Sequence, residues 1–108
     1  MSEKYNGWTN YETWAVNLWF TNKQKIYDYI NKEIDRAKKE ITADDICTKK
    51  ENITHYVADT LKEDIENEMD YQGLYNKSVF TDLINAGLSA VNWYEIACGF
   101  MEDYKDDE

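Results

Sequence analysis

Apolar residues recur with the period of a helix from Tyr11 onward. The apolar positions that follow lie at offsets of 3, 4, 7 and 8, on one helix face: Trp14, Ala15, Leu18 and Trp19. Thr9 and Glu12 have the spacing of a capping box, in which the hydroxyl accepts from a free N–H and the carboxylate reaches back to the cap. The pattern predicts a first helix that begins next to Thr9, after an extended arm formed by residues 1–8.

Two longer helices are predicted in the middle of the chain. A second capping-box spacing, from Thr21 to Gln24, indicates a break and a new helix whose apolar stripe is Ile26, Ile30, Ile34, Ala37 and Ile41. Thr42 is expected to cap a short helical turn. A third helix is expected from about Glu51 to Asp70, with an apolar residue at every fourth position: Ile53, Val57, Leu61, Ile65 and Met69. Because four residues exceed one helical turn, this stripe drifts around the helix, which should cross its neighbours at an angle.

The last part of the chain predicts two short helices. Ser78 is expected to cap a helix through Asn85 that ends before Gly87, with three inward residues: Phe80, Leu83 and Ile84. Asn92 and Glu95 repeat the cap spacing, and the final helix carries Ile96, Ala97, Phe100 and Met101. Residues 102–108 are acidic and are expected to fray. Since the chain also contains no proline, the pattern predicts an all-α fold, a single compact domain of four or five helices over residues 1–108.

Composition narrows the function classes. The 108 residues contain 12 Lys and Arg against 22 Asp and Glu, a net charge of −10, which argues against direct binding of nucleic acid through a basic surface. The sequence has no apolar run long enough to span a membrane and no visible signal peptide. We therefore expect a cytoplasmic protein whose two cysteines, Cys47 and Cys98, are reduced, with Cys98 a small core residue.

The excess negative charge lies in the second half of the chain. Residues 1–50 hold nine basic and eight acidic side chains, whereas residues 51–108 hold three basic and 14 acidic ones. Four of these acids have offsets of 0, 4, 7 and 11, which makes one row about 16 Å long on the third helix, opposite its apolar stripe: Asp59, Glu63, Glu66 and Asp70. The row is either a solvated face that confers solubility or a surface that occupies a basic, nucleic-acid-binding groove of another protein.

The sequence contains no pattern typical of catalysis or of metal binding. His55 is the single histidine, and Asp59 is the acid at helical spacing from it, which is too few ligands for a metal site. Neither cysteine has zinc-ligand spacing, and there is no nucleophile triad, phosphate loop or dinucleotide fingerprint. We therefore expect a protein that is not an enzyme and that needs no cofactor or metal.

Aromatic residues near the N-terminus provide a second candidate surface. Trp19 and Phe20 are adjacent, so on a helix they point about 100° apart and cannot both face one layer. One of the two is therefore expected to line a groove and to be available to a partner. Trp14 and Leu18, in contrast, are expected to pack against the last helix, near Trp93, Ile96 and Phe100.

Two segments resemble a known group of proteins. Residues 7–19, GWTNYETWAVNLW, resemble the GWTNxETWxVxLW opening of an uncharacterised family of small acidic proteins encoded by bacteriophages, plasmids and mobile elements. Residues 91–97, VNWYEIA, are similar to the xxWxEIA ending of the same group. The resemblance implies a genetic setting rather than a reaction. It also implies two helix starts that pack together and join the two ends of the chain.

These observations lead to two main hypotheses about function, and an enzyme with a carboxylate-based site is a third. In the first, the protein is a non-enzymatic phage or mobile-element product whose acidic second half binds a basic protein partner, such as a nucleic-acid-binding host protein in defence or DNA processing. This hypothesis draws on analogy, because small acidic phage proteins often block host nucleases. In the second, the chain is a structural or regulatory helical module that acts through its aromatic N-terminal segment without nucleic-acid mimicry.

Overall fold

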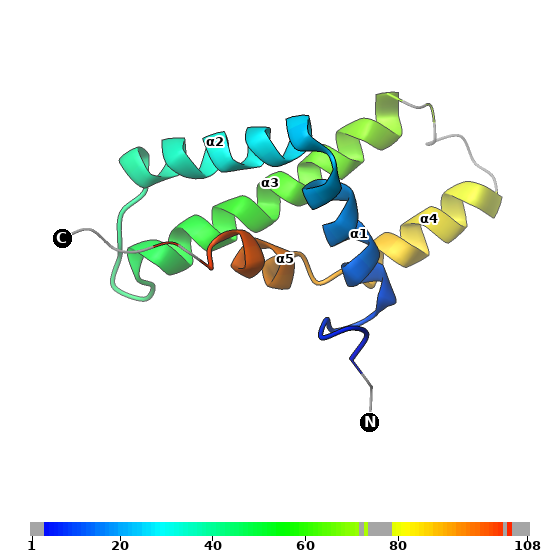
Figure 1. Ribbon diagram of the computed structural model, residues 1–108, viewed down its shortest axis with the longest axis horizontal. Coiled ribbons are helices and arrows are strands. Elements are labelled where there is room, and N and C mark those ends of the chain that lie inside the picture. Colours follow the sequence, from blue (N-terminus) through cyan, green and yellow to red (C-terminus); the bar gives the residue numbers. More distant parts are fainter. Residues whose placement is uncertain (1–3, 72, 74–78, 103, 105–108) are drawn as a thin grey trace.

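The longest helix, α3 (Lys49–Tyr71), forms the centre of the fold. In the computed structural model, which describes residues 4–71, 73, 79–102 and 104, α2 (Gln24–Glu40) and α5 (Trp93–Phe100) both pack against α3. The first helix, α1 (Tyr11–Asn22), contacts α2 and α5, and α4 (Val79–Ser89) extends away from the other helices (Figure 1). The described residues thus form five helices and no strand, which confirms the predicted all-α fold.

The predicted apolar stripes form the core. α2 and α3 bury most of their stripes, and α5 adds two fully buried residues, Ile96 and Ala97. α1 contributes Phe20, which is completely buried. The remaining members of the buried cluster come mainly from α2 and α3: Ile30, Ile34, Ala37, Ile53, Val57, Ala58, Leu61, Val91 and Met101. α3 runs obliquely behind α2 in Figure 1, as the drift of its stripe predicts.

The predicted breaks between helices are confirmed, but several predicted caps are wrong. α1 ends at Asn22 and α2 begins at Gln24, yet the Thr21 hydroxyl donates to the carbonyl of Asn17 instead of capping α2. No helical turn follows Thr42. A capping box instead begins α3 two residues earlier than predicted, because Thr48 and Glu51 exchange backbone-to-side-chain hydrogen bonds of 2.8 and 3.1 Å.

The described part of the N-terminal arm is a tight turn rather than an extended segment. Tyr5 and Trp8 exchange two backbone hydrogen bonds of 2.7 Å each. The two residues between them, Asn6 and Gly7, both have positive φ angles, 48° and 89°. This is the geometry of a type I′ turn, for which Asn-Gly is the preferred dipeptide.

The helix α4 and the C-terminal segment also differ from the predictions. α4 continues through Gly87 to Ser89, and its residues Phe80 and Leu83 are exposed rather than inward. Ser78, the predicted cap, lies outside the described residues, as do residues 103 and 105–108 of the predicted tail. Tyr104, however, does not fray, because its ring is partly buried against the core cluster. Within the described ranges, no helix is long and apolar enough to cross a membrane.

Candidate functional site

The acidic row lies on the exposed face of α3. Its four members, Asp59, Glu63, Glu66 and Asp70, are all exposed, whereas the stripe on the opposite side of the same helix is buried in the core. The helix thus holds four carboxylates at the surface in fixed order, with a spacing of about 5.5 Å along its axis. The structure places these residues together as the sequence predicts, and their role in binding is a proposal taken up below.

The basic residues of α2 form their ion pairs within α2. Arg36 lies 2.7 Å from Glu33 and 3.9 Å from Glu40, and Lys38 lies 3.8 Å from Asp35. In the part of the chain that the structure describes, no salt bridge joins these cations to the acidic row on α3. The row is therefore not explained by ion pairing between the two long helices.

Glu33 is held by two donors from different helices. Arg36 and the hydroxyl of Tyr56 on α3 both bond to the Glu33 carboxylate, at 2.7 and 2.8 Å. Arg36 also donates to the Tyr56 oxygen at 2.7 Å. The hydrogen bonds from Arg36 and Tyr56 lower the pKa of Glu33, because they favour its charged form. This triad fastens α2 to α3 and is structural in character.

A cleft separates the acidic helix from α4. Its volume is about 450 Å³, and it is lined by Lys62, Glu66, Met69, Asn85, Leu88, Ser89, Val91 and Trp93. Glu66 is therefore both a member of the acidic row and part of the cleft wall. The opposite wall belongs to α4 and offers neutral side chains such as Asn85 and Leu88.

A second, apolar groove lies on the other side of α4, against α1. It has a volume of about 260 Å³ and is lined by Tyr11, Glu12, Ala15, Val16, Leu83, Ile84, Gly87, Leu88 and Val91. Leu88 and Val91 line both this groove and the cleft. Three side chains of α4 are more than half exposed: Val79 at 63%, Phe80 at 70% and Leu83 at 63%, of which Leu83 lines the groove. The sequence pattern does not predict this surface, because Phe80 and Leu83 have the helical spacing of core residues.

The two adjacent aromatic residues of α1 have different environments. Trp19 is 40% exposed, whereas Phe20 is fully buried, so Trp19 is the one of the two that is accessible at the surface. Phe20 is needed in the core because α1 supplies no other fully buried apolar side chain. The Nζ atom of Lys23 lies 5.2 Å from the centre of the Trp19 ring, within the range of a cation–π contact.

Trp19 borders a groove that holds a perturbed carboxyl group. The groove has a volume of about 310 Å³ and is lined by Trp19, Lys25, Ile26, Tyr29, Asp64, Ile65 and Glu68. Burial, and secondly the nearby charge of Glu68, raise the pKa of Asp64 above its ordinary value. Burial also raises the pKa of Tyr29, with the charge of Glu33 as the next cause. Two neighbouring acids with one raised pKa do not by themselves form a catalytic pair.

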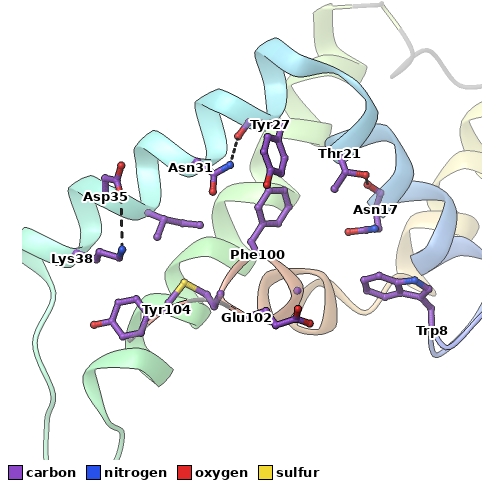
Figure 2. Close-up of a pocket in the computed structure, with 13 residues that line it drawn as sticks. Trp8, Asn17, Thr21, Tyr27, Asn31, Asp35, Lys38, Phe100, Glu102 and Tyr104 are labelled. Atoms are coloured by element: carbon purple, nitrogen blue, oxygen red, sulfur yellow. Dashed lines mark hydrogen bonds and ion pairs between the residues drawn. The ribbon is translucent and has the colours of Figure 1, made fainter. Parts of the chain in front are cut away.

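An aromatic groove lies between α2 and the C-terminal part of the chain. Figure 2 shows Tyr27 and Phe100 facing each other at its centre, with ring centroids 5.7 Å apart, while Trp8 and Tyr104 lie at its two ends. The groove has a volume of about 440 Å³. Its amide Asn31 donates to the carbonyl of Tyr27 at 3.0 Å, which ties it to its own helix. The groove also has charged residues in its lining, Asp35, Lys38 and Glu102, of which Asp35 and Lys38 pair with each other.

The two sequence motifs meet at the N-termini of α1 and α5. Asn10, not Thr9, caps α1: its side-chain oxygen accepts from the backbone N–H and the hydroxyl of Thr13, at 2.9 and 2.7 Å. The same Thr13 hydroxyl accepts from the backbone N–H of Asn92 at 2.9 Å. Asn92 in turn caps α5 by accepting from the N–H of Glu95 at 3.0 Å.

Two further hydrogen bonds complete this connection. The backbone N–H of Thr9 donates to the Glu95 carboxylate at 3.1 Å, and the Asn10 side chain donates to the carbonyl of Ala90 at 2.7 Å. The expectation that the two helix starts pack together is therefore confirmed. The ring of Trp14 lies against Tyr5 and Tyr11, with centroids 5.0 and 5.5 Å away. Among the described residues, Trp14 is not one of the partly buried side chains packed against the core cluster, to which its predicted neighbour Ile96 belongs.

The cysteines and the histidine do not form a reactive site. Cys47 and Cys98 are free, and burial is the main cause that raises the pKa of each thiol. Cys98 is exposed, so its assignment to the core is wrong. His55 lies against Tyr94, with ring centroids 4.9 Å apart. Among the described residues, no group of three or more side chains could hold a metal ion.

The comparisons with known proteins identify a family and no function. No curated protein and no solved structure matches the chain. The model of one family, described as a family of unknown function, DUF7249, matches residues 1–102. The matched region includes both motifs and all five helices. The chain therefore belongs to the family of unknown function DUF7249.

Proposed function

We propose that the protein is a non-enzymatic binding protein whose acidic α3 face docks on a basic surface of a protein partner. The observation that carries this proposal is the exposure of all four acids of the row on one face of α3. Arg36 and Lys38 of the neighbouring helix α2 form their ion pairs with acids of α2 itself. Complementary charge accelerates association and selects partners more than it adds affinity. Such a surface suits a partner that is recognised quickly and at low ionic strength.

The spacing of the row suggests the chemistry of the partner. The carboxylates follow one another at about 5.5 Å along the helix axis, a sparser version of the phosphates of a nucleic-acid strand, which lie about 3.4 Å apart. A groove that binds nucleic acid through Lys and Arg could therefore accept this face. We place the protein in the setting of a phage or mobile element, where a host defence or DNA-processing protein is a partner of this kind, acting in the cytoplasm.

A charge-matched comparison tests the proposal. The row variant carries Asp59→Asn, Glu63→Gln, Glu66→Gln and Asp70→Asn, and the control variant removes four other exposed acids: Asp28, Asp35, Glu40 and Asp45. Each protein is titrated with a short polylysine peptide over a range of salt concentrations. We expect the row variant to lose affinity and salt dependence, because the carboxylates that bind the lysines are gone. The control variant has the same net charge but keeps the row, so it should lose much less. Equal losses in both variants would show that overall charge, and not this face, attracts the peptide.

The exposed tryptophan supports a second candidate function. Trp19 lines the groove that contains Asp64, and its side chain is 40% exposed. A structural or regulatory module that binds through aromatic contacts would use this ring. Retained partner binding in the row variant together with lost binding in a Trp19→Ala variant would favour this second function.

A further inference from the structure

The apolar face of α4 is exposed although the helix is short. α4 has 11 residues, and none of them is buried. Helices of this length are marginal in water unless an apolar face packs against another surface. Phe80 and Leu83 are 70% and 63% exposed, and in Figure 1 most of α4 projects away from the other helices. These features are typical of a helix that a partner covers.

The surface around α4 combines apolar and acidic character. On one side, the apolar groove against α1 continues the exposed face through Ile84 and Leu88. On the other side, the cleft toward α3 has Glu66 of the acidic row in its wall. Leu88 lines both hollows, so the apolar face and the acidic row are parts of one continuous surface.

The charges on this surface restrict the partner. Residues 79–101 contain two charged side chains, Asp82 and Glu95, and both are acidic. Lys62 is the cation in the cleft wall. A second copy of the chain, with a net charge of −10, would bring its own acids toward the row and be repelled. A partner with apolar side chains on one face and cations on another would match both parts of the surface.

We propose that α4 and the acidic row of α3 together bind a basic amphipathic helix of the partner protein. Its apolar side packs on Phe80, Leu83 and Leu88, in the helix-in-groove mode, and its Lys and Arg side chains reach the carboxylates of α3. The basic half of this inference rests on the proposed function, whereas the apolar half rests on α4 alone. A helix of about 14 residues is about 21 Å long and so exceeds the length of the row.

Peptide titrations by fluorescence anisotropy test the inference. The probe is a designed peptide of about 14 residues with leucines on one helical face and lysines on the other. A scrambled peptide of the same composition keeps the charge and loses the apolar face. We expect the designed peptide to bind at least about tenfold more tightly than the scrambled one, since only the designed peptide can bury its leucines.

Variants of the protein assign the two halves of the surface. Leu83→Asp and, separately, Phe80→Ser should each abolish the preference for the designed peptide. Ile46→Asp is the matched control, because Ile46 is 91% exposed in the segment between α2 and α3. Circular dichroism verifies that each variant is folded. Both α4 variants should retain the wild-type melting temperature, because neither side chain is in the core.

The outcomes separate this inference from the proposed function. If Leu83→Asp and Phe80→Ser bind the designed peptide as tightly as the wild type does, the role of α4 is refuted. If the row variant binds the peptide more weakly in the same experiment, the proposed function is still supported. If the row variant binds normally and the α4 variants do not, the proposed function fails and the partner is apolar rather than basic. The free protein could also dimerise in a concentration-dependent way. If Leu83→Asp abolished that dimerisation, the occupant of the α4 surface would be a second copy of the chain and not a basic helix.

Discussion

The hydroxyl of Thr13 accepts a hydrogen bond from the backbone N–H of Asn92, 2.9 Å away and 79 positions later in the sequence. Thr13 is fully buried, and its hydroxyl also donates to the cap residue Asn10 at 2.7 Å. One hydroxyl thus links the beginning of α1 to the beginning of α5. Both of its hydrogen-bond functions are used, as buried polar groups require.

Replacing Thr13 by Val should destabilise the protein by about 1–3 kcal/mol. The change keeps the shape of the side chain but leaves the N–H of Asn92 without its acceptor, and an unsatisfied buried group has a cost of this size. Thr13→Ser is the control, since it retains the hydroxyl. Urea unfolding measures both variants, and a Val variant as stable as the wild type would show that the link is unimportant.

Core truncation should distinguish the two adjacent aromatic residues of α1. Phe20→Ala is expected to cost about 3–5 kcal/mol because it leaves a cavity in the core. Trp19→Ala should cost far less, since Trp19 lies at the surface. Thermal unfolding of the two variants side by side tests this order. A larger loss from Trp19→Ala would mean that its groove contributes more packing than its exposure indicates.

Removal of the acidic row should leave the fold intact and stabilise it slightly. The row contains three neighbouring like-charged pairs, at spacings of 4, 3 and 4 residues, each of which costs about 0.2–0.5 kcal/mol. The fourfold amide variant should therefore melt at or above the wild-type temperature at low salt, and the difference should shrink at high salt because salt screens exposed charges. A clear loss of stability would indicate that the row is part of the structure.

Acid should weaken the attachment of α2 to α3 through Glu33. Its pKa is lowered in the folded state by Arg36 and Tyr56, so its contribution is complete above the ordinary pKa of a glutamate, about 4.3. As pH falls below that value and through the lower folded pKa, this contribution is lost. The Glu33→Gln variant should be less stable than the wild type at neutral pH. Its free energy of unfolding, measured by denaturant titration, should also fall less than that of the wild type between neutral and acidic pH.

Asp64 should have the opposite dependence on pH. Its pKa is raised by burial and by Glu68, so the folded state takes up this proton before the unfolded state does. Its contribution to stability is therefore fully present below the ordinary aspartate value of about 3.9 and is lost as pH rises through the folded pKa. Asp64→Asn should raise stability at neutral pH and remove this part of the pH profile. A decrease at neutral pH would show that the carboxylate makes a necessary interaction.

The sequence predicted the elements that depend on local pattern. The stripes of α2 and α3 are periodic over many residues, and their buried faces follow from that period alone. The caps were harder, because a Thr or Asn near a helix start has several competing partners. Thr48 and Glu51 have the spacing of a capping box, as the structure shows. Asn6-Gly7 is the dipeptide that a hairpin turn prefers.

The errors at α4 and Trp14 have a different origin. Apolar residues at helical spacing indicate that a helix is amphipathic. They do not indicate whether the apolar face packs against the same chain or against another one. Phe80 and Leu83 therefore had the pattern of core residues although the structure leaves them exposed. The position of Trp14 depends on Tyr5, which reaches it only because of the turn at Gly7.

The hydrogen bonds between the beginnings of α1 and α5 have a consequence for biosynthesis. The ribosome must add 79 residues after Thr13 before Asn92 exists to bond with it. At about 5–20 residues per second, this interval is roughly 4–16 s. During that time the apolar side of α1 emerges without its partner helix, and chaperones that bind nascent chains have access to it. Folding of the N-terminal segment is therefore expected to be completed only after the segment around Asn92 has been synthesised.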